Sequence, residues 1–478
     1  MNINQTKTPI IDTLLKFDKL NPDYYCMPSH HRGSCADESF LMLSDTILKY
    51  DLTETPITDD LHEPEYAIAE AQQLAAELFG ADKTFFLVNG TTCGNEAMII
   101  SSVHEGDKIL ISRNCHKSIL MGLIISGATP IYIEPEKSSK LNTFGSISPQ
   151  KVEQAFKENP DIKAFILVNP TYYGICSDLK AIADICHSHN ALLLVDEAHG
   201  AAFSVSDKLP LSAMQSGADM CSQSIHKTAG AMTQSSMLHI KGTLADISKV
   251  DSALKIVQST SPSYMLMASL DAARHRLAVN GKYDIEHLIK LSDYIRNGLN
   301  SIDGVNCYDK HSDTEVFDFD RTRIVFSIDN KCGFDIFDEL FNNYNICAEM
   351  ADDFNVVLIL GPSDSIKQAN RLIAAVKKIA NKKESSRNSE FSMPAIPSMA
   401  LTPRAAYFSK TESIPLEKAE GKISAEMIAP YPPGIPVIYP GEVFTADIIE
   451  FISDAIKEKR HIHGFSDKTM QTVKICIN

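Results

Sequence analysis

Short apolar runs of strand character alternate with helix-like segments in the first half of the chain, and this alternation restricts the fold most strongly. Six runs carry the pattern: 85–88, 108–112, 129–133, 164–168, 192–195 and 220–223. Strands that alternate with helices form a mostly parallel sheet with helices on both faces. Such sheets bind ligands at the carboxyl ends of their strands. The sequence therefore predicts an α/β fold, with a site among the residues that follow these runs.

One lysine follows the last of these runs. Lys227 stands in Ser224-Ile225-His226-Lys227, directly behind small hydroxyl and imidazole side chains. A lysine whose amine is kept neutral by burial or by a neighbouring cation can form a Schiff base with an aldehyde cofactor. Ser224 and His226 could then hold a phosphate on that cofactor. Taken alone, the stretch also fits an ordinary surface lysine after a strand.

Two further runs end in residues that suit the same cofactor. Asp196 follows the run 192–195, so a buried strand delivers a carboxylate to the sheet edge, where it could pair with a pyridinium nitrogen. The run 85–88 ends in Asn89-Gly90-Thr91-Thr92, before a helical segment. Glycine lets the backbone approach a ligand, and a helix start offers free N–H groups to a phosphate. These residues predict a phosphate-binding turn.

Five motifs occur in one order along the chain: Asn89-Gly90-Thr91-Thr92, Arg113-Asn114-Cys115-His116-Lys117-Ser118, Asp196-Glu197-Ala198-His199, Ser224-Ile225-His226-Lys227 and the Pro-rich segment 430–436. In this order they resemble the bacterial Orn/Lys/Arg decarboxylase family, which are pyridoxal-phosphate enzymes of the aspartate-aminotransferase fold type. The resemblance runs from about Asp12 to the end of the chain. It is to the short form, which lacks an N-terminal receiver-like wing domain.

The resemblance implies pyridoxal-phosphate fold type I, with a mostly parallel, seven-stranded-type sheet in a large domain. We expect an N-terminal segment (1–60), the large cofactor-binding domain (61–300), a small α/β domain (301–381), a linker (382–399) and a C-terminal α+β decarboxylase domain (400–478). The linker is also indicated by composition, since it is rich in Ser, Asn, Lys and Pro.

The resemblance also implies roles for single residues around the cofactor. Lys227 would hold the aldehyde, Asp196 would pair with the ring nitrogen, and His116 would stack on the ring. Either Lys227 or His226 would return a proton to the substrate carbon. The expected cofactor-binding residues are Gly90, Thr91, Thr92, His116, Asp196, Ala198, Ser224, His226, Lys227 and, from the other subunit, Ser259.

The implied reaction is pyridoxal-phosphate-dependent decarboxylation of a small basic amino acid to CO2 and an amine of the polyamine pathway. Arginine is the favoured substrate, followed by lysine or ornithine, and Glu349 would face the substrate's distal cation. The sites would be shared between the subunits of a homodimer or a higher homo-oligomer. Because residues 28–33 read Pro-Ser-His-His-Arg-Gly where the family usually has Pro-Gly-His-Lys-x-Gly, an aminotransferase or another lyase is the alternative. A non-catalytic regulatory homologue is a third.

Composition limits the partners and the compartment. The formal net charge of −16 argues against nucleic acid or an anionic membrane as the main partner and suits a cationic substrate. Eleven cysteines without any Cys-x-x-Cys pair predict reduced thiols in the cytoplasm. Neither a signal peptide nor a membrane span is expected. His461 and His463 lack further ligands nearby, so no metal site is expected.

Overall fold

The computed structural model describes residues 4–310, 313–382, 393–430, 434–458 and 460–477. The chain divides into two compact units, Met1–Ser102 with Leu192–Asp284 and Val103–Ala191 with Ile285–Asn478. Much of the expected linker (383–392) and part of the Pro-rich segment (431–433) fall outside the described residues. Within the described ranges, no helix is long and apolar enough to cross a membrane.

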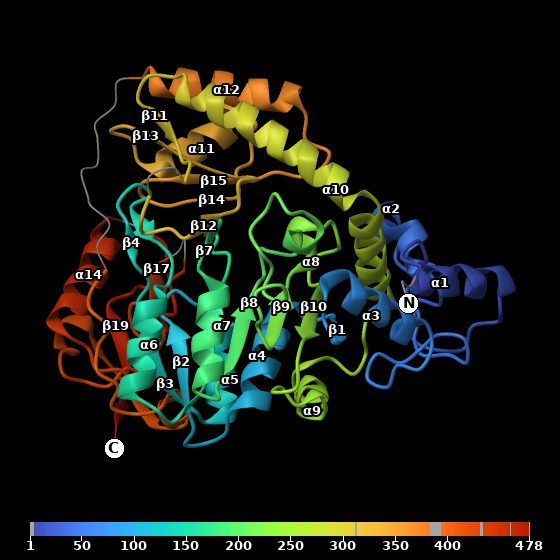
Figure 1. The fold of residues 1–478 in the computed structure, drawn as a ribbon, viewed down its shortest axis with the longest axis horizontal. Helices are drawn as coiled ribbons and strands as arrows, with labels where there is room; N and C mark the ends of the chain where they lie inside the picture. The colour runs from blue at the N-terminus through green and yellow to red at the C-terminus, as the bar shows by residue number, and fades with distance from the viewer. Residues whose placement is uncertain (1–3, 311–312, 383–392, 431–433, 459, 478) are drawn as a thin grey trace. The chain divides into compact units, whose positions relative to one another are not determined.

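The first unit is built on strands β1, β10, β9 and β8, in that order (Figure 1). Strands β8 and β9 are parallel, whereas β10 is antiparallel to both of its neighbours. The elements of this unit are α1 (Pro9–Leu20), α2 (Glu38–Leu48), α3 (Ala67–Phe79), β1 (Lys83–Leu87), α4 (Gly90–Ser102), β8 (Leu192–Asp196), η1 (Phe203–Val205), β9 (Met220–Gln223), α8 (Ile225–Thr228), β10 (Ser236–Ile240), α9 (Ile247–Val257) and the first part of α10 (Tyr264–Asn300).

The second unit contains the parallel strands β6, β2 and β3, and it continues into a four-stranded antiparallel sheet of order β11-β13-β15-β14. Its elements up to residue 191 are β2 (Lys108–Ser112), α5 (Ser118–Ser126), β3 (Thr129–Ile133), β4 (Lys137–Ser138), β5 (Thr143–Phe144), α6 (Pro149–Glu158), β6 (Ile162–Val168), β7 (Ile175–Cys176) and α7 (Leu179–Ser188). From residue 285 to residue 380 they are the rest of α10, β11 (Val305–Cys307), β12 (Asp318–Phe319), β13 (Arg323–Ile328), α11 (Gly333–Tyr344), β14 (Met350–Ala351), β15 (Val356–Ile359) and α12 (Ile366–Ala380).

The C-terminal region of the second unit pairs β16 with β19 in antiparallel register and packs α14 on a small apolar core. Its elements are α13 (Pro403–Tyr407), β16 (Lys410–Pro415), η2 (Leu416–Lys418), β17 (Ala429–Pro430), α14 (Ala446–Lys457), β18 (Ile462–His463) and β19 (Thr472–Ile477). Helix α14 begins where the Thr445 hydroxyl accepts from the amide of Ile448, which satisfies one of the free N–H groups of the first turn.

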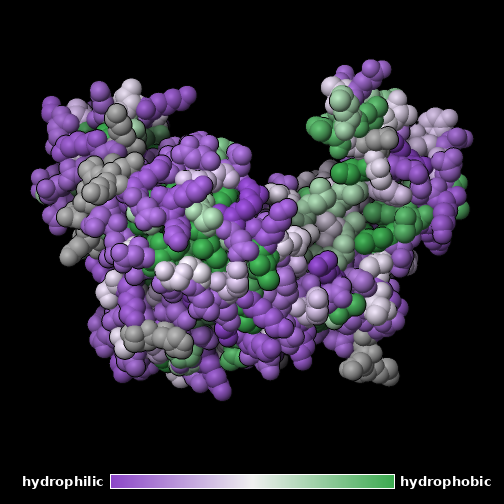
Figure 2. Space-filling model, turned by 90° about the horizontal axis from the view of Figure 1, so that it is seen from above, coloured by the Kyte–Doolittle hydropathy of each residue, from purple (hydrophilic) through white to green (hydrophobic). Residues whose placement is uncertain are grey.

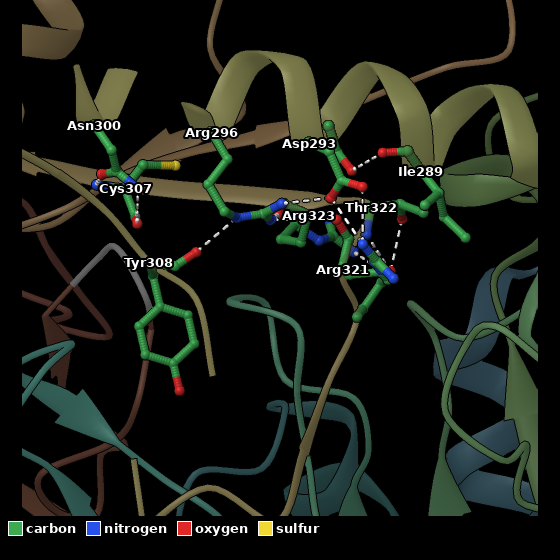
Figure 3. A network of polar contacts seen from close by, with 11 residues as sticks. Ile289, Asp293, Arg296, Asn300, Cys307, Tyr308, Arg321, Thr322 and Arg323 are labelled. Atoms are coloured by element: carbon green, nitrogen blue, oxygen red, sulfur yellow. Dashed lines mark hydrogen bonds and ion pairs between the residues drawn. The ribbon is translucent and has the colours of Figure 1, made fainter. Parts of the chain in front are cut away.

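A polar network ties the last turns of α10 to β13 and to the segment before it (Figure 3). Arg296 Nε donates to the carbonyl of Tyr308 at 2.9 Å, and Nη2 donates to the carbonyls of Arg321 and Arg323 at 3.2 and 3.1 Å. Arg321 donates to both carboxylate oxygens of Asp293 at 2.8 Å. A guanidinium only donates, so its planar fork satisfies several carbonyls at once and fixes the start of β13 and the residue after β11 on the helix.

The strands agree closely with the sequence pattern. Three of the six predicted runs, 108–112, 129–133 and 220–223, coincide with β2, β3 and β9, and the other three begin or end within two residues of a strand. Strand β10 was not predicted, because Ser236 and His239 interrupt its apolar pattern. A hydrogen bond accommodates the buried His239: its Nδ1 lies 2.8 Å from the Thr84 hydroxyl on the neighbouring strand β1. The mixed α/β class with parallel pairings is therefore observed, with β10 as the antiparallel exception.

Candidate functional site

Lys227 lies on the single helical turn α8, immediately after β9. Its Nζ is 3.0 Å from Nε2 of His199, which follows β8 and is 3% exposed. Two basic nitrogens at this distance share one proton more readily than they hold two, because like charges disfavour each other. The pair therefore favours a state in which one of the two groups is neutral. His199 belongs to a motif quoted from the sequence, but no role was predicted for it.

Asp196 ends β8 with its carboxylate 3% exposed. Asn95 Nδ2, on α4, donates to Oδ2 at 2.8 Å, and the amide of Ala198 donates to Oδ1 at 3.2 Å. The structure thus places a buried, oriented carboxylate in the same unit as Lys227. Asn95 is a second residue whose role was missed, although it lies one turn after the predicted phosphate-binding residues.

Three hydroxyls gather beside the first turn of α4. Thr91 Oγ1 lies 2.5 Å from Ser224 Oγ and donates to Ser236 Oγ at 3.2 Å. The helix begins at Gly90, whose φ of 73° lies in the left-handed region that favours glycine. Thr92 follows on the same turn and is half-buried. Hydroxyls and free helical N–H groups together suit an anion. Ser236 comes from the unpredicted strand β10, which is why it was missed.

Gly94 lets α4 approach β9 closely. A Cβ at this position would lie 2.1 Å from Ser222 Oγ and 2.9 Å from Leu87 Cδ1. No side chain fits there without a shift of these neighbouring atoms. The hydroxyl cluster therefore depends on a glycine in the second turn of α4.

His226 is half-buried, and its Nδ1 lies 3.1 Å from the carbonyl oxygen of Ser235. Burial lowers the pKa of His226 below its usual value, and the charge of Lys227 acts in the same direction. Because a carbonyl only accepts, the ring proton of the neutral form lies on Nδ1 and leaves Nε2 as an acceptor. Ala198 is 6% exposed, consistent with a closely packed position.

Ser259 is exposed, after α9. Its amide donates to Asn89 Oδ1 at 3.1 Å, and its carbonyl oxygen lies 2.8 Å from His62 Nε2. Its hydroxyl accepts from the amide of Ser261 at 3.1 Å. These contacts fix the backbone of Ser259 and leave it at the surface.

Two predicted site residues belong to the second unit. His116 is exposed on the turn between β2 and α5, where the amide of Ser118 donates to its Nδ1 at 3.2 Å. Glu349 is exposed directly before β14 and borders a cavity of about 390 Å³ together with Cys347 and Leu358. Its amide donates to the carbonyl of Val357 at 3.0 Å.

The segment with the altered Pro-Ser-His-His-Arg-Gly sequence bonds within the N-terminal region. His30 Nε2 lies 3.2 Å from Asp51 Oδ2, and its Nδ1 accepts from the amide of Gly33 at 3.1 Å. Arg32 forms an ion pair with Asp18. In this structure the side chains of the segment thus serve local folding.

A buried polar chain crosses the strands next to Asp196. Gln223 Nε2 donates to Glu197 Oε2 at 2.7 Å, and Gln223 Oε1 lies 3.1 Å from His239 Nε2. Burial raises the pKa of Glu197 to about 8 and lowers that of His239 to about 3, so both side chains are neutral near pH 7. The chain holds β8, β9 and β10 together without a buried charge.

Comparison with known proteins identifies the family. A model described as "Orn/Lys/Arg decarboxylase, major domain" matches residues 8–329, and one described as "Orn/Lys/Arg decarboxylase, C-terminal domain" matches residues 385–475. Arginine decarboxylase of Bacillus anthracis is 39% identical over 482 residues, covering 99% of this chain and 98% of that protein. Arginine decarboxylase of Bacillus subtilis (strain 168) is 38% identical over 482 residues, with the same coverage.

A solved structure confirms the fold class. The lysine decarboxylase of Francisella novicida superposes with a TM-score of 0.86 at 22% identity, covering 98% of this chain and 81% of that one. At this identity the likeness concerns the fold alone. The family assignment rests on the two family models and on the relatives of nearly equal length. The chain belongs to the Orn/Lys/Arg decarboxylase family.

Proposed function

We propose that the protein is a pyridoxal-phosphate-dependent decarboxylase of a basic amino acid, with arginine as the preferred substrate. The observation that carries the proposal is Lys227 next to His199, in one unit with the oriented carboxylate of Asp196 and the hydroxyl cluster at α4. The preference for arginine is supported by the names of relatives at 38% and 39% identity.

The donor set fits pyridoxal phosphate. Lys227 offers an amine for the aldehyde, Asp196 an anion for the ring nitrogen, and Thr91, Ser224 and Ser236 offer hydroxyls for the phosphate beside a helix start. Ser222 Oγ, next to this cluster, is buried without a hydrogen-bond partner among the described residues. When bound, the cofactor supplies an electron sink for the electrons left behind as CO2 departs.

The chain's own residues orient groups and move protons. His199 Nε2, 3.0 Å from Lys227 Nζ, would take a proton from the lysine and so keep a neutral amine available. Lys227, or alternatively His226, would return a proton to the substrate carbon after CO2 leaves. Asn95 and the amide of Ala198 hold the Asp196 carboxylate in one orientation, so its charge acts on a fixed point.

Two predicted site residues of the second unit would contact the substrate and the cofactor. Glu349 would accept the distal cation of the substrate, and its exposed side chain borders a cavity of about 390 Å³. His116 would stack on the cofactor ring with its flat imidazole. The overall charge of −16 favours approach of a cationic amino acid.

We also propose a homodimer as the minimum assembly. The N-terminal segments expose Tyr25 (89%), Met27 (71%), Phe40 (52%), Met42 (87%) and Leu43 (81%). An exposed group of large apolar side chains marks an interaction surface, and Figure 2 shows hydrophobic residues at the surface among hydrophilic ones. All eleven cysteines are free thiols, which suits a reducing compartment such as the cytoplasm.

The decisive experiment incubates cofactor-loaded protein separately with arginine, lysine and ornithine, and follows CO2 release and the amine formed. Agmatine from arginine is the expected product, and Lys227→Ala should abolish both turnover and the visible absorbance of bound cofactor. A keto-acid product would indicate an aminotransferase instead. A fully active Lys227→Ala variant would refute the assignment of the lysine.

A further inference from the structure

The turn that carries His116 is anchored by a buried ion pair to the C-terminal region. Arg113, the first residue after β2, is 4% exposed in its side chain, and Glu442 is 0% exposed. Arg113 Nη1 donates to Glu442 Oε1 at 2.5 Å, and Nη2 donates to Oε2 at 2.9 Å. Nη2 also donates to the carbonyl of Val437 at 3.2 Å. The guanidinium is thus held in a planar, two-pronged geometry that lysine cannot reproduce.

Two tyrosines complete the anchor. The rings of Tyr132 on β3 and Tyr439 stack with centroids 5.2 Å apart, and the guanidinium carbon of Arg113 lies 4.7 Å from each centroid. The amide of Tyr439 donates to Glu442 Oε2 at 2.7 Å. Tyr439 Oη also lies 3.4 Å from Sγ of Cys115, the residue before His116. The segment 437–442 therefore contacts the turn at positions 113 and 115.

The turn is tied to the C-terminal region directly before His116. Residues 113 and 115 of the turn both contact the C-terminal region, and His116 follows them with its side chain exposed. Ser118 bonds the His116 ring locally, while the contacts of Arg113 and Cys115 tie the backbone of the turn to the C-terminal region.

The buried ion pair between Arg113 and Glu442 suits a role in orientation better than a role in stability. A buried ion pair stabilises a fold less than apolar residues of the same volume, because both charges lose their water. It does fix orientation, since the pair is satisfied in only one geometry. We propose that Arg113 and Glu442 are positioning residues, through which the C-terminal region holds His116 against the cofactor. This inference rests on the proposed function, in which His116 stacks on the pyridoxal ring.

The test measures cofactor binding rather than turnover. Apoprotein is titrated with pyridoxal phosphate, and the visible circular dichroism of the bound cofactor is recorded for wild type, Glu442→Gln, Arg113→Lys and His116→Ala. We expect Glu442→Gln and Arg113→Lys to weaken cofactor binding about tenfold and to reduce the dichroism, because small misplacements of a positioning group have large effects. The effect of Glu442→Gln should largely vanish in a His116→Ala background, as expected for residues that act through one another.

Glu426→Gln is the matched control. Glu426 is 6% exposed in the same C-terminal region, but its oxygens accept from the amides of Ser466 and Lys474 at 2.8 and 2.9 Å, away from the turn. This variant should lower thermal stability and leave cofactor affinity and dichroism unchanged. If Glu442→Gln does not fold, Arg113→Lys, which keeps the charge, carries the test.

The outcomes separate this inference from the proposed function. Wild-type protein that binds no pyridoxal phosphate would refute the proposed function. Wild type that binds the cofactor, with Glu442→Gln and Arg113→Lys behaving like Glu426→Gln, would overturn the positioning role alone. Additive effects of Glu442→Gln and His116→Ala would overturn it as well, because they would show that the ion pair acts independently of the histidine.

Discussion

Replacing Gly94 by alanine tests how tightly α4 must pack to form the hydroxyl cluster. The added Cβ would lie 2.1 Å from Ser222 Oγ and 2.9 Å from Leu87 Cδ1, whereas carbon atoms in contact are separated by about 3.5–4.0 Å. Rotation of the Ser222 hydroxyl can relieve the shortest contact, but the carbon contacts at 2.9 and 3.0 Å remain, so the helix or the strand must move by about 0.5–1 Å. Overpacking of this kind costs about 1–3 kcal/mol in the free energy of unfolding.

The displacement should also reach the cofactor. Thr91 stands one turn before Gly94 and bonds Ser224 and Ser236, so a shifted helix separates the three hydroxyls. We expect Gly94→Ala to lower the denaturant midpoint and to weaken pyridoxal-phosphate binding together, measured by chemical unfolding and by cofactor titration.

A second substitution provides a rescue. Ser222→Ala removes the oxygen that lies 2.1 Å from the new Cβ, while the Ser222 Cβ at 3.0 Å stays. The double variant Gly94→Ala/Ser222→Ala should recover part of both losses. Gly361→Ala is the control, since its new Cβ would meet only Asp364 at 3.9 Å. A Gly94→Ala protein as stable as wild type, with unchanged cofactor affinity, would refute the packing argument.

Three further predictions follow from single contacts. Asn95→Ala removes the 2.8 Å donor that orients the Asp196 carboxylate, and leaving a buried acceptor unsatisfied costs about 1–3 kcal/mol. Because the carboxylate then loses its fixed orientation, kcat/KM for decarboxylation should fall, as measured by CO2 release. Burial raises the pKa of Glu197 from 4.5 to about 8, so the folded state holds a proton that the unfolded state releases between these two pH values. The free energy of unfolding therefore falls by at most about 5 kcal/mol as the pH rises from 4.5 to about 8. Glu197→Gln should therefore gain stability relative to wild type between pH 5 and pH 9 in chemical unfolding, and a constant difference would contradict this. Leu43 is 81% exposed in the apolar group proposed as the dimer interface, so Leu43→Glu should weaken the homodimer in sedimentation experiments without changing thermal stability. An unaltered sedimentation profile would exclude this residue from the interface.

The sequence predicted three of the four main strands of the first unit, and the residues expected to hold the cofactor there stay a prediction. Lys227, Asp196, Thr91 and Ser224 follow strands or begin a helix, and the structure brings the hydroxyls of Thr91 and Ser224 to 2.5 Å. These residues could be predicted from the sequence because parallel strands end at one edge of a sheet, so residues that follow such strands are expected to lie close to one another. The placement of His116 and Glu349 at a bound cofactor and substrate stays a prediction.

The sequence by itself determined the α/β class and the positions of strands β1, β2, β3, β6, β8 and β9. It also located the lysine, carboxylate and hydroxyls that follow these strands, because local periodicity and turn residues fix these features. Only the tertiary structure decided which side chains meet. His199 lies against Lys227, and Asn95 orients Asp196 across 101 residues. Ser236 enters from a strand whose apolar pattern is interrupted, and Arg113 pairs with Glu442 across 329 residues. Such contacts join segments distant along the chain, and they form only when burial removes water and makes an unpaired polar group costly.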